Sequence, residues 1–309
     1  MFLNNQTEVT EFILQDFSDS LPLRILLFGT FFSLYAAALT GNVLIIVLVL
    51  WSSILHTPMY FFLVNLSMLD IMCTTSVLPK VLGNLVSEKK TISYGGCMTQ
   101  VYFLAWSVSG DLLLFTAMAY DRYAAICHPL HYSTMMSKKI CVLLAVGVWS
   151  ICGLNATINT GLIIRLSFCG PNIIDQFFCE IPPVLLLSCT STYVNDIMIV
   201  LSDVFFSVLN FLLTIVSYCF IISSIMGIRT REGKKRAFST CSSHLIVVTM
   251  YYCTVFYAYV SPISNYSPQS GKLVAVLYTA VSPTLNPLIY TLRNKDVREA
   301  LRKLPLFSK

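Results

Sequence analysis

Long apolar stretches alternate with short polar segments along this chain. Seven of the apolar stretches have the roughly 20 or more residues that a helix needs to cross the hydrocarbon core of a membrane. They cover residues 24–50, 58–82, 97–126, 140–164, 197–226, 237–261 and 271–292. This pattern predicts an all-α membrane protein, built as a bundle of seven transmembrane helices.

Charged residues interrupt the third and fifth stretches, so hydropathy alone leaves five spans as an alternative. The third contains Asp111, Asp121 and Arg122, and the fifth contains Asp203. Seven spans place fourteen of the 20 Lys and Arg residues on one side of the membrane or at its edge. This asymmetry favours seven, because basic residues accumulate in cytoplasmic loops.

The same asymmetry predicts the domain organisation. We expect an extracellular segment at residues 1–23, a seven-helix domain at residues 24–292 and a cytoplasmic segment at residues 293–309. The second extracellular loop, residues 165–196, is unusually long, and loops of this length are usually functional or disordered. Residues 294–303 are expected to form a short amphipathic helix on the cytoplasmic membrane surface.

Composition narrows the class of protein further. The chain is 56% hydrophobic and 11% charged, whereas soluble domains carry about 25% charged residues. This composition argues against a soluble enzyme. It also argues against nucleic acid as a binding partner, although the net charge of the chain is +5. The sequence has no HExxH, GxxxxGK[ST] or GxSxG motif, so we expect no catalytic residues, no enzyme activity and no required cofactor.

The predicted topology sorts the glycosylation sequons and the cysteines. Asn5 lies in the extracellular segment and is the expected acceptor, whereas Asn265 lies in a short loop close to the membrane. Four extracellular cysteines allow three disulfide pairings, among which chain geometry alone does not choose. They are Cys97, Cys169, Cys179 and Cys189.

Several long motifs resemble one known family over nearly the whole chain. They are Gly41-Asn42, LHTPMYFFL at 55–63, MAYDRYAAIC at 118–127, Ser217-Tyr218, KRAFSTCSSHL at 235–245 and PTLNPLIY at 283–290. A single Asp-Arg-Tyr triplet would be weak evidence, whereas this ordered set is specific. The chain resembles the mammalian odorant receptors, a branch of the rhodopsin-like G-protein-coupled receptors.

The resemblance implies a function and a location. Such receptors bind small, largely hydrophobic odorants in the outer half of the bundle and activate a stimulatory, olfactory-type G protein that raises cyclic AMP. The implied location is the plasma membrane, in the cilia of olfactory sensory neurons, with membrane lipids as partners of the basic cytoplasmic rim. An ion- or proton-coupled transporter that uses Asp70 and Asp111 is the alternative function, although no internal repeat is evident.

The resemblance also implies roles for individual residues. Disulfides Cys97–Cys179 and Cys169–Cys189 would tie the second extracellular loop over the outer mouth of the bundle. Arg122 would help to admit the C-terminal helix of a G-protein α subunit, or else simply reach the membrane interface. The implied switch residues are Asp121, Arg122, Tyr123, Tyr218, Asn286, Pro287 and Tyr290.

Two of these implied roles concern the last part of the bundle. Tyr218 and Tyr290 would swing inward and support the open state through hydrogen bonds. Pro287 is expected to break the seventh helix locally, because proline removes a backbone donor, and a purely structural kink is the alternative to a switch.

Asp70 and Asp111 lie near the middle of the predicted membrane, where an unpaired carboxylate is costly. The resemblance places both beside Ser282 and Asn286. These residues would hold Na⁺ as an allosteric ion that favours the inactive bundle, or the two acids would share a proton. The family commonly has glutamate at the position of Asp111, and the shorter aspartate weakens the case for direct coordination.

The motifs also place a ligand pocket in the outer half of the bundle. Its expected lining is Leu104, Ala105, Val108, Ser109, Ser202, Phe206, Tyr252, Val255, Tyr259 and Thr279. This apolar lining with a few hydroxyls suits a small hydrophobic ligand. Leu104 stands where amine receptors carry aspartate, which disfavours a small amine anchored there. Asp203 either contacts a polar ligand, faces the loop or water, or pairs with Arg165 or Lys272.

Overall fold

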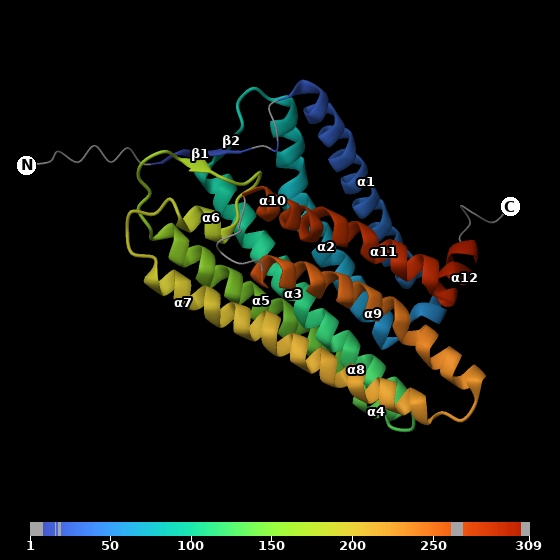
Figure 1. Cartoon of the computed structure of the whole chain (residues 1–309). Coiled ribbons are helices and arrows are strands. Elements are labelled where there is room, and N and C mark those ends of the chain that lie inside the picture. Colours follow the sequence, from blue (N-terminus) through green and yellow to red (C-terminus); the bar gives the residue numbers. More distant parts are fainter. Residues whose placement is uncertain (1–8, 16, 18–19, 261–267, 304–309) are drawn as a thin grey trace, which may run out of the picture.

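A computed structural model describes residues 9–15, 17, 20–260 and 268–303. Its main feature is a bundle of long helices that lie side by side (Figure 1). The first four long helices are α1 (Leu21–Trp51), α2 (Pro58–Val86), α3 (Tyr94–Cys127) and α5 (Lys138–Ile164). Each is at least 27 residues long and therefore long enough to cross a membrane.

The last three long helical regions are less regular. The fifth comprises α7 (Tyr193–Ser202), the π-helical segment η2 (Asp203–Leu209) and α8 (Asn210–Gly227), and the sixth is α9 (Arg231–Val260). The seventh comprises α10 (Pro268–Val276), the π-helical segment η4 (Leu277–Val281) and α11 (Ser282–Arg293), followed by α12 (Lys295–Lys303). The short elements are β1 (Glu11–Leu14), η1 (Ser53–Leu55), β2 (Thr91–Ser93), α4 (Tyr132–Met135), β3 (Ile173–Ile174) and α6 (Ile181–Leu185).

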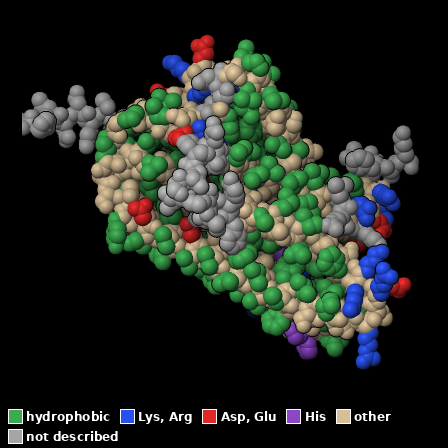
Figure 2. All heavy atoms as spheres, viewed as in Figure 1, with side chains coloured by type: hydrophobic (Ala, Val, Ile, Leu, Met, Phe, Trp, Pro, Cys, Tyr) green, Lys and Arg blue, Asp and Glu red, His purple; other side chains and the backbone are tan. Residues whose placement is uncertain are grey.

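Length and composition identify membrane-spanning helices directly. Among the described residues, six helical segments are long and apolar enough to cross a membrane: Leu21–Trp51, Pro58–Val86, Tyr94–Cys127, Tyr132–Ile164, Tyr193–Gly227 and Gly271–Thr291. The remaining region, α9, has 30 residues but begins with a charged segment. Leu50 and Leu143 are 71% and 68% exposed, and apolar side chains cover the flank of the bundle in Figure 2, which suits a lipid environment.

The two ends of the bundle differ in structure and charge. We call the end that carries the three strands, α6 and both disulfides the disulfide end, and the opposite end, with α12, the α12 end (Figure 1). Lys and Arg side chains gather at the α12 end, around α12 and the start of α9 (Figure 2). The α12 helix is the short amphipathic helix that the sequence predicts, because Val297 and Ala300 are buried on its inner face.

The N-terminal strand is a feature that the sequence analysis missed. β1 lies between β2, with which it is antiparallel, and β3, with which it is parallel. Its alternation buries Phe12 and Leu14, and Phe12 packs edge-on against Phe168 of the long loop. The strand therefore fastens the N-terminal segment to two loops at the disulfide end.

The prediction that Pro287 breaks the seventh helix is wrong, because α11 continues through it. A proline has no N–H, so the carbonyl of Pro283, four residues earlier, loses its helical donor. Asn42 of α1 supplies that donor instead, with its Nδ2 at 3.0 Å from the Pro283 oxygen. The irregular segment lies upstream, at η4, where the N–H of Ser282 reaches back five residues to the Leu277 carbonyl.

Candidate functional site

A cavity of about 470 Å³ lies in the half of the bundle near the disulfide end. Helices α3, α5, α7, α9 and α10 and the segments η2 and η4 supply its walls, and α6 of the long loop covers it. Its lining is mostly apolar, as is usual for a site that takes small organic ligands. The expected residues that do line it are Leu104, Ala105, Val108, Ser109, Ser202, Asp203 and Phe206.

Two other expected lining residues lie elsewhere. Tyr252 is buried against Phe211, with 4.9 Å between ring centroids, and Tyr251 faces the cavity in its place. One residue turns a helix by about 100°, so a shift of one position moves the side chain off the wall. Thr279 is fully buried within η4 and donates to the Ala275 carbonyl. The side chains of Val255 and Tyr259 lie outside the described part of the structure, as do Asn5 and Asn265.

Much of the polar lining was not predicted from the sequence. The helix α5 contributes Asn155 and Asn159, one turn apart, and the long loop contributes Glu180 together with Pro182 and Pro183. The two asparagines give a signal that could have found them, since polar residues four apart share one face of an otherwise apolar helix. Glu180, Pro182 and Pro183 show no comparable sequence pattern, because their position over the cavity depends on the path of the loop.

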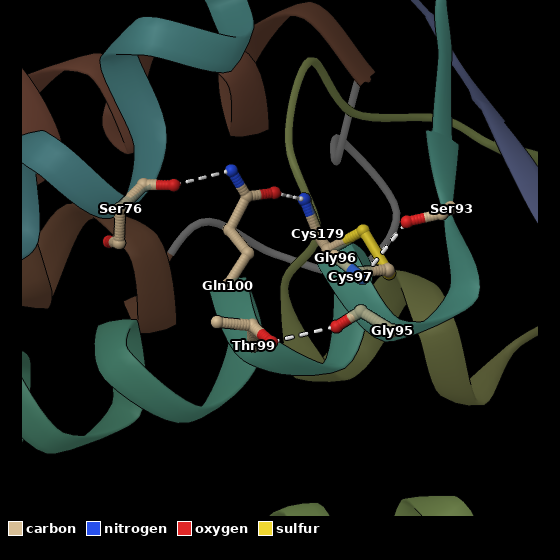
Figure 3. Close-up of a disulfide and its surroundings, with 8 residues drawn as sticks. All are labelled: Ser76, Ser93, Gly95, Gly96, Cys97, Thr99, Gln100 and Cys179. Carbon is tan, nitrogen blue, oxygen red and sulfur yellow. Dashed lines mark hydrogen bonds between the residues drawn. A yellow bond between two sulfur atoms is a disulfide. The ribbon is translucent and has the colours of Figure 1, made fainter.

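The disulfide Cys97–Cys179 fixes this path at its centre (Figure 3). Beside it, Gln100 of α3 donates its Nε2 to the Ser76 carbonyl of α2 at 2.9 Å and accepts the Cys179 N–H at its Oε1 at 2.6 Å (Figure 3). The loop is thereby attached to α3 by one covalent bond and one buried hydrogen bond. The second implied disulfide, Cys169–Cys189, is also present and closes the loop on itself.

Glu180 follows this disulfide directly and faces the cavity. Its Oε1 accepts a hydrogen bond of 2.6 Å from Tyr278 Oη of η4. Burial raises the pKa of the Glu180 carboxyl above its usual range, and hydrogen bonds from Tyr278 and Gln176 oppose that rise. The loop thus places an acid over the ligand cavity and connects it to the seventh helical region.

A second cluster of predicted residues lies near the α12 end. Arg122 pairs with Asp121, its neighbour on α3, and both side chains are largely buried. Tyr132 of α4 donates to the other oxygen of Asp121, Oδ1, at 2.8 Å. Tyr123 instead bonds His128 Nε2 at 2.9 Å. The arginine is therefore held by an acid that a second helix also binds.

The remaining switch residues surround this cluster. Tyr218 of α8 bonds His244 Nδ1 of α9 at 2.7 Å, and His244 was not among the residues that the sequence analysis named. Tyr290 of α11 is buried, and its Oη has no hydrogen-bond partner among the described residues. A buried hydroxyl without a partner is costly, so a conformation that provides one is favoured.

The acids near the middle of the bundle show only part of a cation site. Asn286 donates its Nδ2 to both carboxylate oxygens of Asp70, at 3.1 and 3.0 Å. Asp111 Oδ1 is buried without a hydrogen-bond partner among the described residues, which suits a cation ligand. Among the residues that the structure describes, no cluster of three or more His, Cys, Asp or Glu side chains is fit for a metal ion, so Na⁺ would also need neutral oxygens such as that of Ser282.

Comparison with known proteins decides the family. A family model described as olfactory receptor matches residues 31–308. The human olfactory receptor 13A1 is 62% identical over 306 residues, which are 99% of this chain and 93% of that protein. The human olfactory receptor 13G1 is 49% identical over 99% of both chains, and the mouse olfactory receptor 5AR1 is 44% identical over 97% of both.

The chain belongs to the olfactory receptor family. It is therefore a seven-transmembrane receptor of the G-protein-coupled class and not an enzyme, and it is a multi-pass protein of the plasma membrane. In this olfactory receptor, α3 carries both Leu104 of the cavity wall and Arg122 near the other end. One continuous helix thus extends from the cavity to the buried ion pair.

Proposed function

We propose that this receptor detects small, largely hydrophobic odorants in the 470 Å³ cavity and activates a stimulatory, olfactory-type G protein that raises cyclic AMP. The observation that supports this most directly is the mainly apolar cavity beneath the disulfide-linked loop. A ligand of about 10 heavy atoms that gains roughly 0.5 kcal/mol per atom would bind with a Kd on the order of 0.1 mM. Recognition is then weak and broad.

The proposed orientation places the disulfide end outside the cell and the α12 end in the cytoplasm. Disulfides form in oxidising compartments, and basic residues gather on the cytoplasmic side of membranes. Both rules agree for this bundle, with Cys97–Cys179 and Cys169–Cys189 at one end and the basic start of α9 at the other. Under this proposal Asn5 carries the glycan, and olfactory cilia are the site of action.

Activation would act on the Asp121–Arg122 pair. A ligand that contacts Tyr251 of α9 in the cavity would favour outward displacement of the opposite end of that helix. Arg122 would then exchange Asp121 for acceptors of the G-protein α subunit. Tyr290, whose hydroxyl has no partner among the described residues, would find one in this opened state.

The test measures cyclic AMP in cells that express the receptor with an olfactory-type G protein, over a chemically broad odorant panel. A saturable response that Arg122→Ala abolishes, with surface staining unchanged, is the expected result. Absence of any response despite surface expression would contradict the proposal. Uptake of a coupled ion or proton without nucleotide exchange on the G protein would instead support a transporter that uses Asp70 and Asp111.

A further inference from the structure

Three of the hydroxyl groups that line the cavity donate their protons within the protein. Ser109 Oγ donates to the Ala105 carbonyl at 2.7 Å, and Thr254 Oγ1 donates to the Met250 carbonyl at 2.9 Å. Ser202 Oγ donates to Asn155 Oδ1 at 2.8 Å. Each oxygen keeps a lone pair, so each of these groups can accept a hydrogen bond from a ligand.

Three larger side chains of the lining also donate their protons within the protein. Tyr278 donates its hydroxyl proton to Glu180 at 2.6 Å, and Tyr251 donates to the Val108 carbonyl at 3.4 Å. Asn159 donates its Nδ2 to the backbone and side-chain oxygens of Asn155, both at 3.0 Å. Both amide protons of Asn159 are thereby used, and its Oδ1 can only accept a hydrogen bond.

The loop above the cavity adds few donors. Its lining positions include Pro182 and Pro183, which have no backbone N–H. Among the lining residues that the structure describes, none is Lys, Arg or His. The nearby Lys272 is buried, and its Nζ lies 3.2 Å from Asp175 Oδ1. Among the lining side chains that the structure describes, the Ser207 hydroxyl and the Asn155 amide are the donors that remain.

Acceptors, in contrast, are abundant and include two carboxyl groups. Glu180 reaches the cavity from the loop and Asp203 reaches it from η2. A carboxylate has about four acceptor positions, more than one or two protein donors fill. The polar character of the cavity is therefore strongly unbalanced, with many acceptors and few donors.

We propose that this cavity selects ligands that carry a hydrogen-bond-donating head group, a hydroxyl or an ammonium, on an apolar body. The inference rests on the proposed odorant-binding function and names its ligand class. A donor head group can bond to the acceptors of the lining, whereas an ether or ketone brings lone pairs against lone pairs. A carboxylate ligand adds a negative charge beside Glu180 and Asp203 and is rejected most strongly.

A matched head-group series tests the proposal. Primary alcohols, primary amines, methyl ethers and carboxylic acids are compared on the same straight-chain, branched and aromatic skeletons, with cyclic AMP as the readout. For each skeleton that activates the receptor, the alcohol or the amine is expected to be at least about tenfold more potent than the ether and the acid. Equal potency across the head groups would overturn the proposal.

Two conservative variants test which acceptors carry the preference. Glu180→Gln and Asp203→Asn each replace an acceptor oxygen by a donor NH₂ with little change in volume. Each is expected to lower the potency of the best donor ligand by about tenfold while the matched ether changes less. Glu88→Gln, at an exposed acid of the same end, is the control and is expected to change neither.

The outcomes separate this proposal from the function on which it rests. Activation by ethers or acids alone would overturn the donor rule and leave the receptor function standing. Absence of activation by every compound, with surface expression confirmed, would contradict both. If one variant fails to reach the surface, the other variant and the wild-type series still decide. A larger loss for the amine than for the alcohol supports an ammonium as the preferred donor, and equal losses support a neutral hydroxyl.

Discussion

Tyr218 and His244 join α8 to α9 through a hydrogen bond of 2.7 Å between Oη and Nδ1, deep within the half of the bundle near the α12 end. The two rings also stack, with 15° between their planes. The second ring nitrogen of His244, Nε2, is buried without a partner in the described structure. The pair therefore holds two neighbouring helices together at one polar point in an apolar environment.

Loss of this bond is expected to destabilise the receptor. Tyr218→Phe leaves Nδ1 of His244 buried without its tyrosine partner, which costs about 1 to 3 kcal/mol. The measurement is the thermal unfolding of purified receptor in detergent or nanodiscs. Tyr193→Phe, at a position 70% exposed, is the matched control and should leave the unfolding temperature unchanged. Equal unfolding temperatures for the Tyr218→Phe variant and the wild type would contradict this prediction.

The Asp121–Arg122 pair makes a prediction about signalling without ligand. Asp121→Asn removes the negative charge that holds the guanidinium, and each 1.4 kcal/mol lost from the closed state raises the active fraction about tenfold. Basal cyclic AMP, normalised to surface expression, is expected to rise severalfold. Tyr132→Phe, which loses only the 2.8 Å bond to Asp121, should give a smaller rise. Glu232→Gln at an exposed acid is the control, and an unchanged basal level in Asp121→Asn would refute the role of the pair.

The long helices were predictable because a helix that crosses a lipid bilayer must have a minimum length and an apolar composition. Both properties can be read directly from the sequence. The third span, expected at 97–126, runs over Tyr94–Cys127, and its earlier start is explained by Ser93, whose Oγ accepts the Gly96 N–H. The π-helical segment η2 was not predictable from hydropathy. At its end the side-chain amide of Asn210 donates to the Phe205 carbonyl, five residues earlier.

The cavity could be predicted only where one helix face defines it. The α3 positions Leu104 and Val108 lie one turn apart, and both line the cavity as expected. Tyr251 and Tyr252 are adjacent in sequence. Because the helix around them is apolar on all sides, its sequence pattern does not indicate which of the two tyrosines faces the cavity. Glu180 lines the cavity because a disulfide and a loop carry it there, and strand β1 exists because loops distant in sequence pair with it. Neither the place of Glu180 nor the presence of β1 can be predicted from the neighbouring residues in the sequence.

Close helix packing at two glycines is sensitive to a single methyl group. A Cβ at Gly41 would lie 2.8 Å from Pro287 Cγ, and one at Gly110 would lie 2.6 Å from Leu69 Cδ1. Gly41→Ala is expected to lower stability by about 1 to 3 kcal/mol because the proline ring is rigid, and Gly110→Ala by less. Gly147→Ala, with open space around its Cβ, should be neutral or stabilising by about 0.5 to 1 kcal/mol. Thermal unfolding checks all three, and similar shifts at Gly41 and Gly147 would contradict the packing argument.

Glu180 makes stability depend on pH in a defined direction. Its pKa in the folded receptor is raised above the usual 4.5, so the native state holds the proton more tightly than the unfolded chain. Raising the pH above about 4.5 towards the native pKa therefore lowers the free energy of unfolding through this group. Glu180→Gln should remove that part of the pH slope, whereas Glu88→Gln should retain it. Unfolding temperatures at about pH 5 and pH 7 measure the slope, and an unchanged slope in Glu180→Gln would disprove the assignment.

Sodium dependence would distinguish an ion site from a shared proton at Asp70 and Asp111. The buried Asp111 Oδ1 without a described hydrogen-bond partner favours a cation, while Asn286 already donates to both oxygens of Asp70. If Na⁺ binds the closed bundle, replacing K⁺ by Na⁺ at constant ionic strength raises the unfolding temperature and lowers basal cyclic AMP. A Na⁺ concentration about 100 times its Kd adds about 2.7 kcal/mol to the free energy of unfolding. Asp111→Asn should abolish both effects, and Asp196→Asn, at an exposed acid, should preserve them. Identical behaviour of the wild type in Na⁺ and K⁺ would exclude the sodium site and favour the shared proton, because a proton bound between the two carboxyls responds to pH and not to the choice of alkali cation.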